Sequence, residues 1–166
     1  MNTRALTQAV LAGLLKPALS EVNMINAPVV AKERGMKVSE LRRDQQGVFE
    51  GYIRVGIVTQ GQSRTVAGTV FSDGRPRIIQ IKGINMDAEF RPLMLYVTNT
   101  DKPGFIGRLG TLLGNAGINI ASFAFGRVSD GGDAIGLVAV DTPVPDSVLG
   151  EIRNMPNVHQ AKRLAF

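Results

Sequence analysis

The sequence has no cysteine and no tryptophan, and its 166 residues include a single histidine, His159. Without cysteine the chain forms no disulfide and offers no thiolate as a nucleophile or iron–sulfur ligand. A zinc site is also disfavoured, because zinc in proteins is held mainly by sets of cysteine and histidine side chains. We therefore expect no metal in this chain, and we expect His159 to be structural or exposed.

Long apolar runs are missing as well, and none approaches the roughly 20 residues that a membrane-spanning helix needs. The opening MNTRALTQAVLAGLL has no small-residue cleavage pattern, so we interpret it as a soluble helix rather than a signal peptide. These absences favour a cytoplasmic protein without a membrane partner. The net charge of +5 leaves nucleic acid or an anionic metabolite open as a partner, although the 19 basic residues are spread along the chain.

The first half of the chain is predicted to be helical and then to form a β meander. Apolar residues at helical spacing predict a first helix that Pro17 limits, followed by helices at 20–25 and 28–34 and a polar helix or loop at 37–47. Strands are predicted at 48–58, 65–71 and 77–84, with SDGRP as a turn. This pattern indicates a small helix-plus-antiparallel-sheet domain over residues 1–90, with the boundary in the polar segment 86–92.

In the second half, residues 91–166, the apolar residues alternate clearly between the spacing of strands and that of helices. Strands are predicted at 93–99, 118–128, 134–141 and 157–164, and helices at 104–115 and 145–154. The order β-α-β-β-α-β is the split βαβ, ferredoxin-like arrangement, so the fold class is α+β. Apolar residues on both faces of the strand at 134–141 predict that Val138 and Val140 face one way, and Ile135, Leu137 and Ala139 the other. One of these sets should meet a partner subunit or the first domain.

The stretch from Leu95 to Asn119 combines a strand, a sharp turn and an amphipathic helix. Pro103 suits the first helical position, where its missing N–H is no loss. The amides that follow, those of Gly104, Phe105 and Ile106, would then lack intrahelical partners and attract a carboxylate or phosphate. Asp101 alone is more often a turn residue than a ligand-binding one. Its combination with the helix start and Asn119 predicts a small-molecule site.

Two other interpretations of this region are weaker. Gly107, Gly110, Gly114 and Gly117 are spaced three, four and three residues apart within a helix, which favours packing glycines over a G-x-G-x-x-G dinucleotide loop. We therefore expect neither NAD binding nor dehydrogenase activity from this chain. Phe123 and Phe125 alternate on a strand taken to be central, beside Arg127, as in RNA-recognition folds, but the surrounding ASFAFGRV matches that motif poorly, so core or interface aromatics are favoured.

The segment NTDKPGFIGRLGTLLGNAGINIASFAFGR resembles the opening half of an ACT domain, a metabolite-sensing module, in the form found in D-3-phosphoglycerate dehydrogenase. The helices followed by GTVFSDGRPRIIQIKG resemble the allosteric substrate-binding domain that precedes the ACT domain in the long form of that enzyme. This resemblance covers nearly the whole chain and implies a carboxy-terminal regulatory fragment, with catalysis and NAD in another part of the enzyme. The iron–sulfur L-serine dehydratases resemble the same pair of domains, but they need cysteines for their cluster.

The resemblance implies L-serine as a feedback effector and a homo-oligomer, a dimer or tetramer, as the assembly. It assigns the effector to Asn99, Asp101, Gly104, Phe105, Ile106 and Asn119, with Asn119 contributed by the neighbouring subunit. It also implies a candidate anion site for a phosphorylated substrate at Arg75, Arg77 and Lys82, although solvated strand charges are the favoured interpretation of these residues. Two alternatives stay open, a ferredoxin-like nucleic-acid-binding protein and an oligomerisation module without a ligand, and titrations with serine and RNA would separate them.

Overall fold

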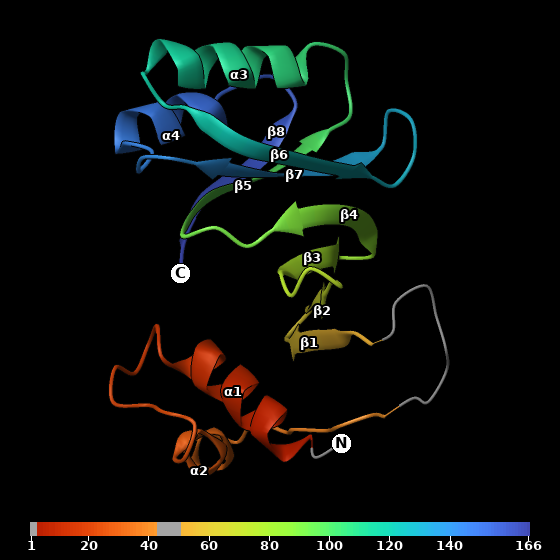
Figure 1. Ribbon diagram of the computed structural model, residues 1–166, viewed down its shortest axis with the longest axis vertical. Helices are drawn as coiled ribbons and strands as arrows, with labels where there is room; N and C mark the ends of the chain where they lie inside the picture. Colours follow the sequence, from red (N-terminus) through yellow and green to blue (C-terminus); the bar gives the residue numbers. More distant parts are fainter. Residues whose placement is uncertain (1–2, 43–50) are drawn as a thin grey trace. The chain divides into compact units, whose positions relative to one another are not determined.

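The computed structural model describes residues 3–42 and 51–166, which form two compact units, Met1–Gln46 and Gly47–Phe166 (Figure 1). In the described residues, the first unit contains two helices and no strand, and the second contains two four-stranded sheets with two helices. No helix in the described part of the chain is long and apolar enough to span a membrane. The division between compact units falls between Gln46 and Gly47. The predicted boundary near residue 90 concerns a different division of the chain and stays a prediction.

The first unit consists of α1 (Arg4–Leu15) and α2 (Ala27–Glu33). Their apolar faces meet in a small core made by Leu11, Ala12, Leu15, Val22, Ala27 and Ala31. The prediction of a helix at 20–25 is wrong. Asn23 Oδ1 accepts the amides of Ile25 at 2.8 Å and Asn26 at 3.1 Å, so this side chain stabilises turns in place of helical bonds. Residues 36–42 form no regular element, and the remainder of the predicted polar segment lies outside the described residues.

The first sheet is an antiparallel meander of β1 (Ile53–Thr59), β2 (Gln62–Val70), β3 (Pro76–Ile81) and β4 (Ile84–Glu89). The prediction of three strands is therefore wrong by one. Lys82 and Gly83 have φ of 50° and 82°, and this left-handed pair makes the tight turn that ends β3 and starts β4. The segment predicted as a polar boundary thus contributes most of β4. The start of the first predicted strand, 48–50, lies outside the described residues.

The second sheet contains β5 (Leu93–Thr100), β6 (Ile120–Arg127), β7 (Asp133–Val140) and β8 (Val158–Ala165). The helices α3 (Phe105–Asn115) and α4 (Asp146–Arg153) connect these strands and cover one face of the sheet (Figure 1). All pairings are antiparallel, in the order β6-β7-β5-β8, which confirms the ferredoxin-like prediction. The strand β6 is at the edge of the sheet, so its assignment as a central strand was wrong.

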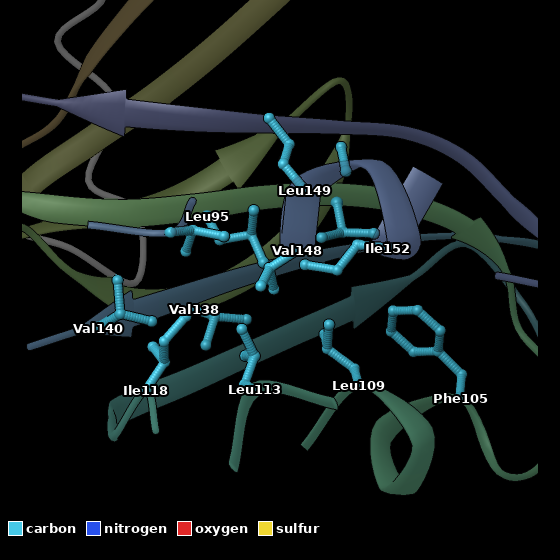
Figure 2. Packing of buried hydrophobic residues seen from close by; sticks show 13 residues of the cluster. Leu95, Phe105, Leu109, Leu113, Ile118, Val138, Val140, Val148, Leu149 and Ile152 are labelled. Carbon is cyan, nitrogen blue, oxygen red and sulfur yellow. The ribbon is translucent and has the colours of Figure 1, made fainter. Parts of the chain in front are cut away.

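The main core lies between this sheet and its two helices. Figure 2 shows Phe105, Leu109 and Leu113 extending from α3 into the cluster, and Val148, Leu149 and Ile152 entering it from α4. Val138 and Val140 belong to this core. The opposite side of β7 behaves differently, because Leu137 packs with Met94 of β5, Ile78 of β3 and Ala88 of β4. The predicted second apolar set therefore does meet the preceding segment, through Leu137 and the β3–β4 hairpin.

Candidate functional site at the start of α3

The turn between β5 and α3 is built around Gly104. Its φ is 87°, a left-handed conformation that only glycine adopts without strain, and it caps α3, whose first residue is Phe105. The carbonyl of Gly104 accepts the amide of Arg108 at 3.0 Å, which closes the first turn. The prediction that Pro103 is the first helical residue is wrong by two positions, because the left-handed glycine delays the helix until after the turn.

The free amides at this helix start differ from those predicted. The Phe105 amide donates to the Lys102 carbonyl at 3.4 Å, so it is already engaged. The amides of Gly104, Ile106 and Gly107 donate to no oxygen among residues 3–42 and 51–166. Together with the positive end of the helix dipole, these donors form an environment that favours an anion. Gly107 was missed because the sequence alone did not reveal where the helix begins.

A surface hollow of about 530 Å³ opens in front of these amides. Its walls are the turn 101–104, the first residues of α3, the end of β6 and the β6–β7 turn at Asp130 and Gly131. Two contacts hold the walls together. The Asp101 amide donates to the Gly132 carbonyl at 2.8 Å, and the Phe105 and Phe125 rings pack with centroids 6.0 Å apart. The helix start and the hairpin turn are thus joined at both the backbone and the side-chain level.

Charged side chains meet in this hollow. Arg127 at the end of β6 donates from one terminal nitrogen to Asp101 Oδ2 at 2.7 Å, and its other terminal nitrogen lies 2.8 Å from Asp130 Oδ1. The hydrogen bond to Asp101, and then the charge of Asp130, raise the pKa of Arg127 above its ordinary value. The guanidinium therefore remains charged at any ordinary pH, and Asp101 has a cationic partner before any ligand arrives.

In the sequence alone, Arg127 stands out only as a neighbour of two phenylalanines. Alternation along β6 was the signal that could have found it, because residues 123, 125 and 127 share the face that α3 covers. This alternation also argues against an RNA-stacking role. Phe123 and Phe125 pack against the core beneath the helices, with ring centroids 6.3 Å apart, and so they are not on the open face that a base would need.

Asn99 is fully buried on β5, two residues before Asp101. Its Nδ2 donates to the Thr100 carbonyl at 2.9 Å, while its Oδ1 has no hydrogen-bond partner in the described part of the chain. A buried acceptor without a donor is costly, so this oxygen is available to a ligand or a water molecule. Asn99 is not among the residues that line the hollow.

Asn119 lies at the opposite end of α3 from Asp101. The helix has 11 residues, which at about 1.5 Å each separate its two ends by roughly 16 Å. The Asn119 side chain is exposed, and its Nδ2 donates to Asp141 Oδ2 at 2.6 Å. Within one chain, therefore, Asp101 and the helix start meet in the hollow, but Asn119 does not join them.

The candidate anion site on the first sheet is not assembled as an open cationic cluster. Arg77 lies 3.2 Å from both Asp87 and Glu89 and 3.6 Å from Asp73, and Arg75 lies 3.6 Å from Glu89. Lys82 directly follows the far end of β3, about 17 Å from Arg77 at the usual rise of a strand. These arginines are occupied by carboxylates, and the anion site stays a prediction.

His159 on β8 is exposed, as predicted, and its Nε2 lies 2.9 Å from Thr100 Oγ1. No group of three or more acidic, histidine or cysteine side chains that could hold a metal occurs among the residues that the structure describes. The lining of the hollow offers backbone amides, two carboxylates and two cationic side chains, which suit the binding of a small polar ion.

Comparisons with known proteins match both halves of the chain. The family described as the D-3-phosphoglycerate dehydrogenase intervening domain matches residues 1–82, and the ACT domain family matches residues 93–157. The D-3-phosphoglycerate dehydrogenase of Bacillus subtilis is 35% identical over 163 residues, covering 98% of this chain and 31% of the relative. The enzyme of Archaeoglobus fulgidus is 36% identical over 163 residues, and that of Synechocystis 34% over 161, each covering 96% of this chain. The chain thus spans about a third of the length of these relatives. It covers 31% of the Archaeoglobus enzyme and 29% of the Synechocystis enzyme.

Proposed function

The chain is a regulatory region of the D-3-phosphoglycerate dehydrogenase family, an intervening domain followed by an ACT domain, and we propose that it binds L-serine as a feedback effector and mediates oligomerisation. The parent enzyme would be a cytoplasmic, NAD-dependent oxidoreductase that catalyses the first step of L-serine biosynthesis. Its catalytic site and NAD would belong to a part of the enzyme other than the two matched domains. This chain would contribute control and assembly.

The observation that carries the proposal is the pairing of free amides with a carboxylate in one hollow. The amides of Gly104, Ile106 and Gly107 supply donors for an α-carboxylate at the positive end of α3. Asp101, in the same hollow, supplies an acceptor for an α-ammonium. A cradle of donors with the Asp101 carboxylate beside it matches the two charged groups of an amino acid.

The serine hydroxyl would be held by Asn99. Its Oδ1 is buried and without a partner among the described residues, so a donor that reached it would remove a desolvation cost of about 1–3 kcal/mol. Because Asn99 is fully buried and does not line the hollow, the residues around it would have to move to admit the hydroxyl. Serine has few atoms, and with a ceiling of roughly 1.5 kcal/mol per heavy atom we expect micromolar or weaker affinity.

Dimerisation through β6 would bring Asn119 to the hollow of a second copy. Among the described strands β6 is hydrogen-bonded only to β7, so its outer edge can pair with another β6. In an antiparallel pair about a two-fold axis, the start of one β6 lies beside the end of the other. Asn119 directly precedes β6, and Arg127 ends it. Serine would then contact both subunits and strengthen their association.

Isothermal titration of L-serine and glycine into the wild type and the Asp101→Asn variant tests this proposal. The wild type should bind serine more tightly than glycine, which lacks the hydroxymethyl group, and the variant should lose at least tenfold in serine affinity. Asp146→Asn is a suitable control, because Asp146 is also paired with an arginine, Arg163, but lies at the start of α4. Absence of binding to the wild type, or equal affinity in all three proteins, would refute the assignment.

A further inference from the structure

Arg127 is already bound to the carboxylate, that of Asp101, which the ammonium of an amino acid is expected to use. It contacts Asp101 Oδ2 at 2.7 Å, and its side chain is half exposed, with 51% of its surface accessible. The side chain of Asp101 is 19% accessible, so its charge is only partly screened by water. The other oxygen, Oδ1, has no hydrogen-bond partner in the described part of the chain and is the one left for a ligand.

The four charged side chains that line the hollow balance one another, and the guanidinium of Arg108 lies beside it at Gly104. Asp101 and Asp130 are matched by Lys102 and Arg127, all of which line the hollow. An arriving ammonium must therefore share Asp101 with a guanidinium that is already bound there, and two cations on one carboxylate repel each other. A ligand of the same shape with a hydroxyl in place of the ammonium meets no such competition, and its carboxylate gains a nearby cation.

We propose that Arg127 is a specificity-determining residue, which competes with the ligand's ammonium for Asp101 and so reduces the preference of the site for an amino acid over the corresponding hydroxy acid. This inference rests on the proposed amino-acid site. It adds a residue from β6 to a site otherwise made by the β5–α3 turn. Asp130 moderates the competition, because it holds the second side of the guanidinium at 2.8 Å and shares its charge.

Two variants, Arg127→Gln and Asp130→Asn, should change this competition in opposite directions. Arg127→Gln removes the cation, so serine should bind more tightly and L-glycerate, the hydroxy acid of the same shape, more weakly. Asp130→Asn removes the second anchor and leaves Arg127 to Asp101 alone, so serine should bind more weakly. This second effect should be small, because the Asp130 side chain is 92% accessible and its charge is screened by water and salt.

The experiment is titration calorimetry of L-serine and L-glycerate into the full chain at low ionic strength. The measured quantity is the ratio of the glycerate Kd to the serine Kd. We expect the ratio to rise at least fivefold in Arg127→Gln and to fall about twofold in Asp130→Asn. Arg91→Gln is the control and should leave the ratio unchanged, because Arg91 is similarly exposed, at 48%, and paired at 2.9 Å with Glu89, but lies outside the hollow.

The outcomes separate this inference from the proposed function. Serine binding to the wild type with the same ratio in Arg127→Gln, or a ratio that falls there, overturns the role of Arg127 and leaves the serine site intact. A change in ratio for Arg91→Gln as large as that for Arg127→Gln would show a long-range charge effect and would also overturn it. No binding of either ligand to the wild type refutes both the serine site and the role of Arg127.

Discussion

Gly126 of β6 lies against the backbone of Asn85 in β4. A Cβ atom at residue 126 would stand 2.4 Å from the Asn85 carbonyl oxygen and 2.7 Å from Cγ2 of Ile84. The two strands belong to different sheets, so this close approach is where the meander docks onto the face of the second sheet that its helices leave uncovered. The same face is sealed by Leu137 and Met94 against Ile78 and Ala88.

Gly126→Ala should therefore destabilise the second unit. The obstructing atom is a backbone oxygen, which cannot rotate away as a side chain can, so β4 has to move. We expect a loss of about 1–3 kcal/mol in the free energy of unfolding, as for other overpacked sites. Urea unfolding followed by circular dichroism measures it, and faster amide exchange in β4 would locate the change.

Gly136→Ala is the matched control for this prediction. Gly136 lies on the neighbouring strand β7, and a Cβ there would be 3.8 Å from the Phe123 and Phe125 rings, an ordinary contact distance. We expect its free energy of unfolding to change by no more than about 0.5 kcal/mol, or to rise slightly because the unfolded chain loses freedom. Equal losses in both variants would show that the space around Gly126 is not the cause.

The core beneath α3 gives a second prediction. Leu109 is completely buried among residues from the sheet and α4, and Figure 2 shows it inside the cluster. Leu109→Ala removes this contact area and leaves a cavity, so we expect a loss of about 2–5 kcal/mol in unfolding free energy. Ile106→Ala, on the same helix but 51% exposed, should cost far less. Similar urea midpoints for the two variants would contradict the packing described.

A third prediction concerns pH in the first unit. Glu40 accepts hydrogen bonds from Thr3 and Thr7 at the start of α1. The bond from Thr7, and then that from Thr3, lower the pKa of Glu40 below its ordinary value of 4.5. Because the folded-state pKa is depressed, the stabilisation is complete above pH 4.5 and is lost as the pH falls through the folded value.

Glu40→Gln should accordingly weaken the protection of α1 amides from hydrogen exchange near neutral pH. Its difference from the wild type should shrink as the pH is lowered past the folded pKa of Glu40, because the wild-type carboxyl is then neutral too. Glu33→Gln removes a charge from the end of α2 and should show no such dependence. A difference that grew on acidification would have the wrong sign and would reject the role of Glu40.

Much of the second unit could be predicted from the sequence, because its apolar residues recur at regular strand or helix spacing and its turns carry glycine or proline. The predicted range of α3 starts one residue early and ends correctly, and that of α4 is one residue longer at each end. The β1–β4 meander of the same unit was harder to predict. The turn at Lys82 depends on a non-glycine residue with positive φ, and no pattern in the apolar residues marks it, so β3 and β4 were merged.

The site was predicted only in part, for reasons of geometry. Asp101 and the helix start are local in sequence, so the turn chemistry around Gly104 indicated them. Arg127 and Asp101 are 26 residues apart and meet because β5 and β6 both pair with β7, so their contact requires the sheet register. The free amides were predicted incorrectly because the sequence favours Pro103 as the first helical residue, whereas α3 begins at Phe105. The bond from the Phe105 amide to the Lys102 carbonyl follows from the left-handed turn at Gly104.

The final prediction concerns Asn119 and the assembly. In one chain Asn119 binds Asp141 at 2.6 Å and is about a helix length from Asp101, so it can reach a serine in the hollow only from another copy. A serine held by two subunits lowers the dissociation constant of the dimer, and dimerisation raises the affinity for serine by the same factor. Sedimentation velocity of the wild type should therefore give a dimer whose dissociation constant falls on addition of serine.

Asn119→Ala should still dimerise but should respond to serine several-fold less, because the contact across the interface is lost while the amides and Asp101 remain. Asn154→Ala, at the end of α4, removes an asparagine from the same domain away from the β6 edge and should behave as the wild type. A wild type that is monomeric at tens of micromolar would reject the assembly. A serine effect of equal size in the wild type and Asn119→Ala would show that Asn119 takes no part in joining the subunits, whatever the affinity of the hollow itself.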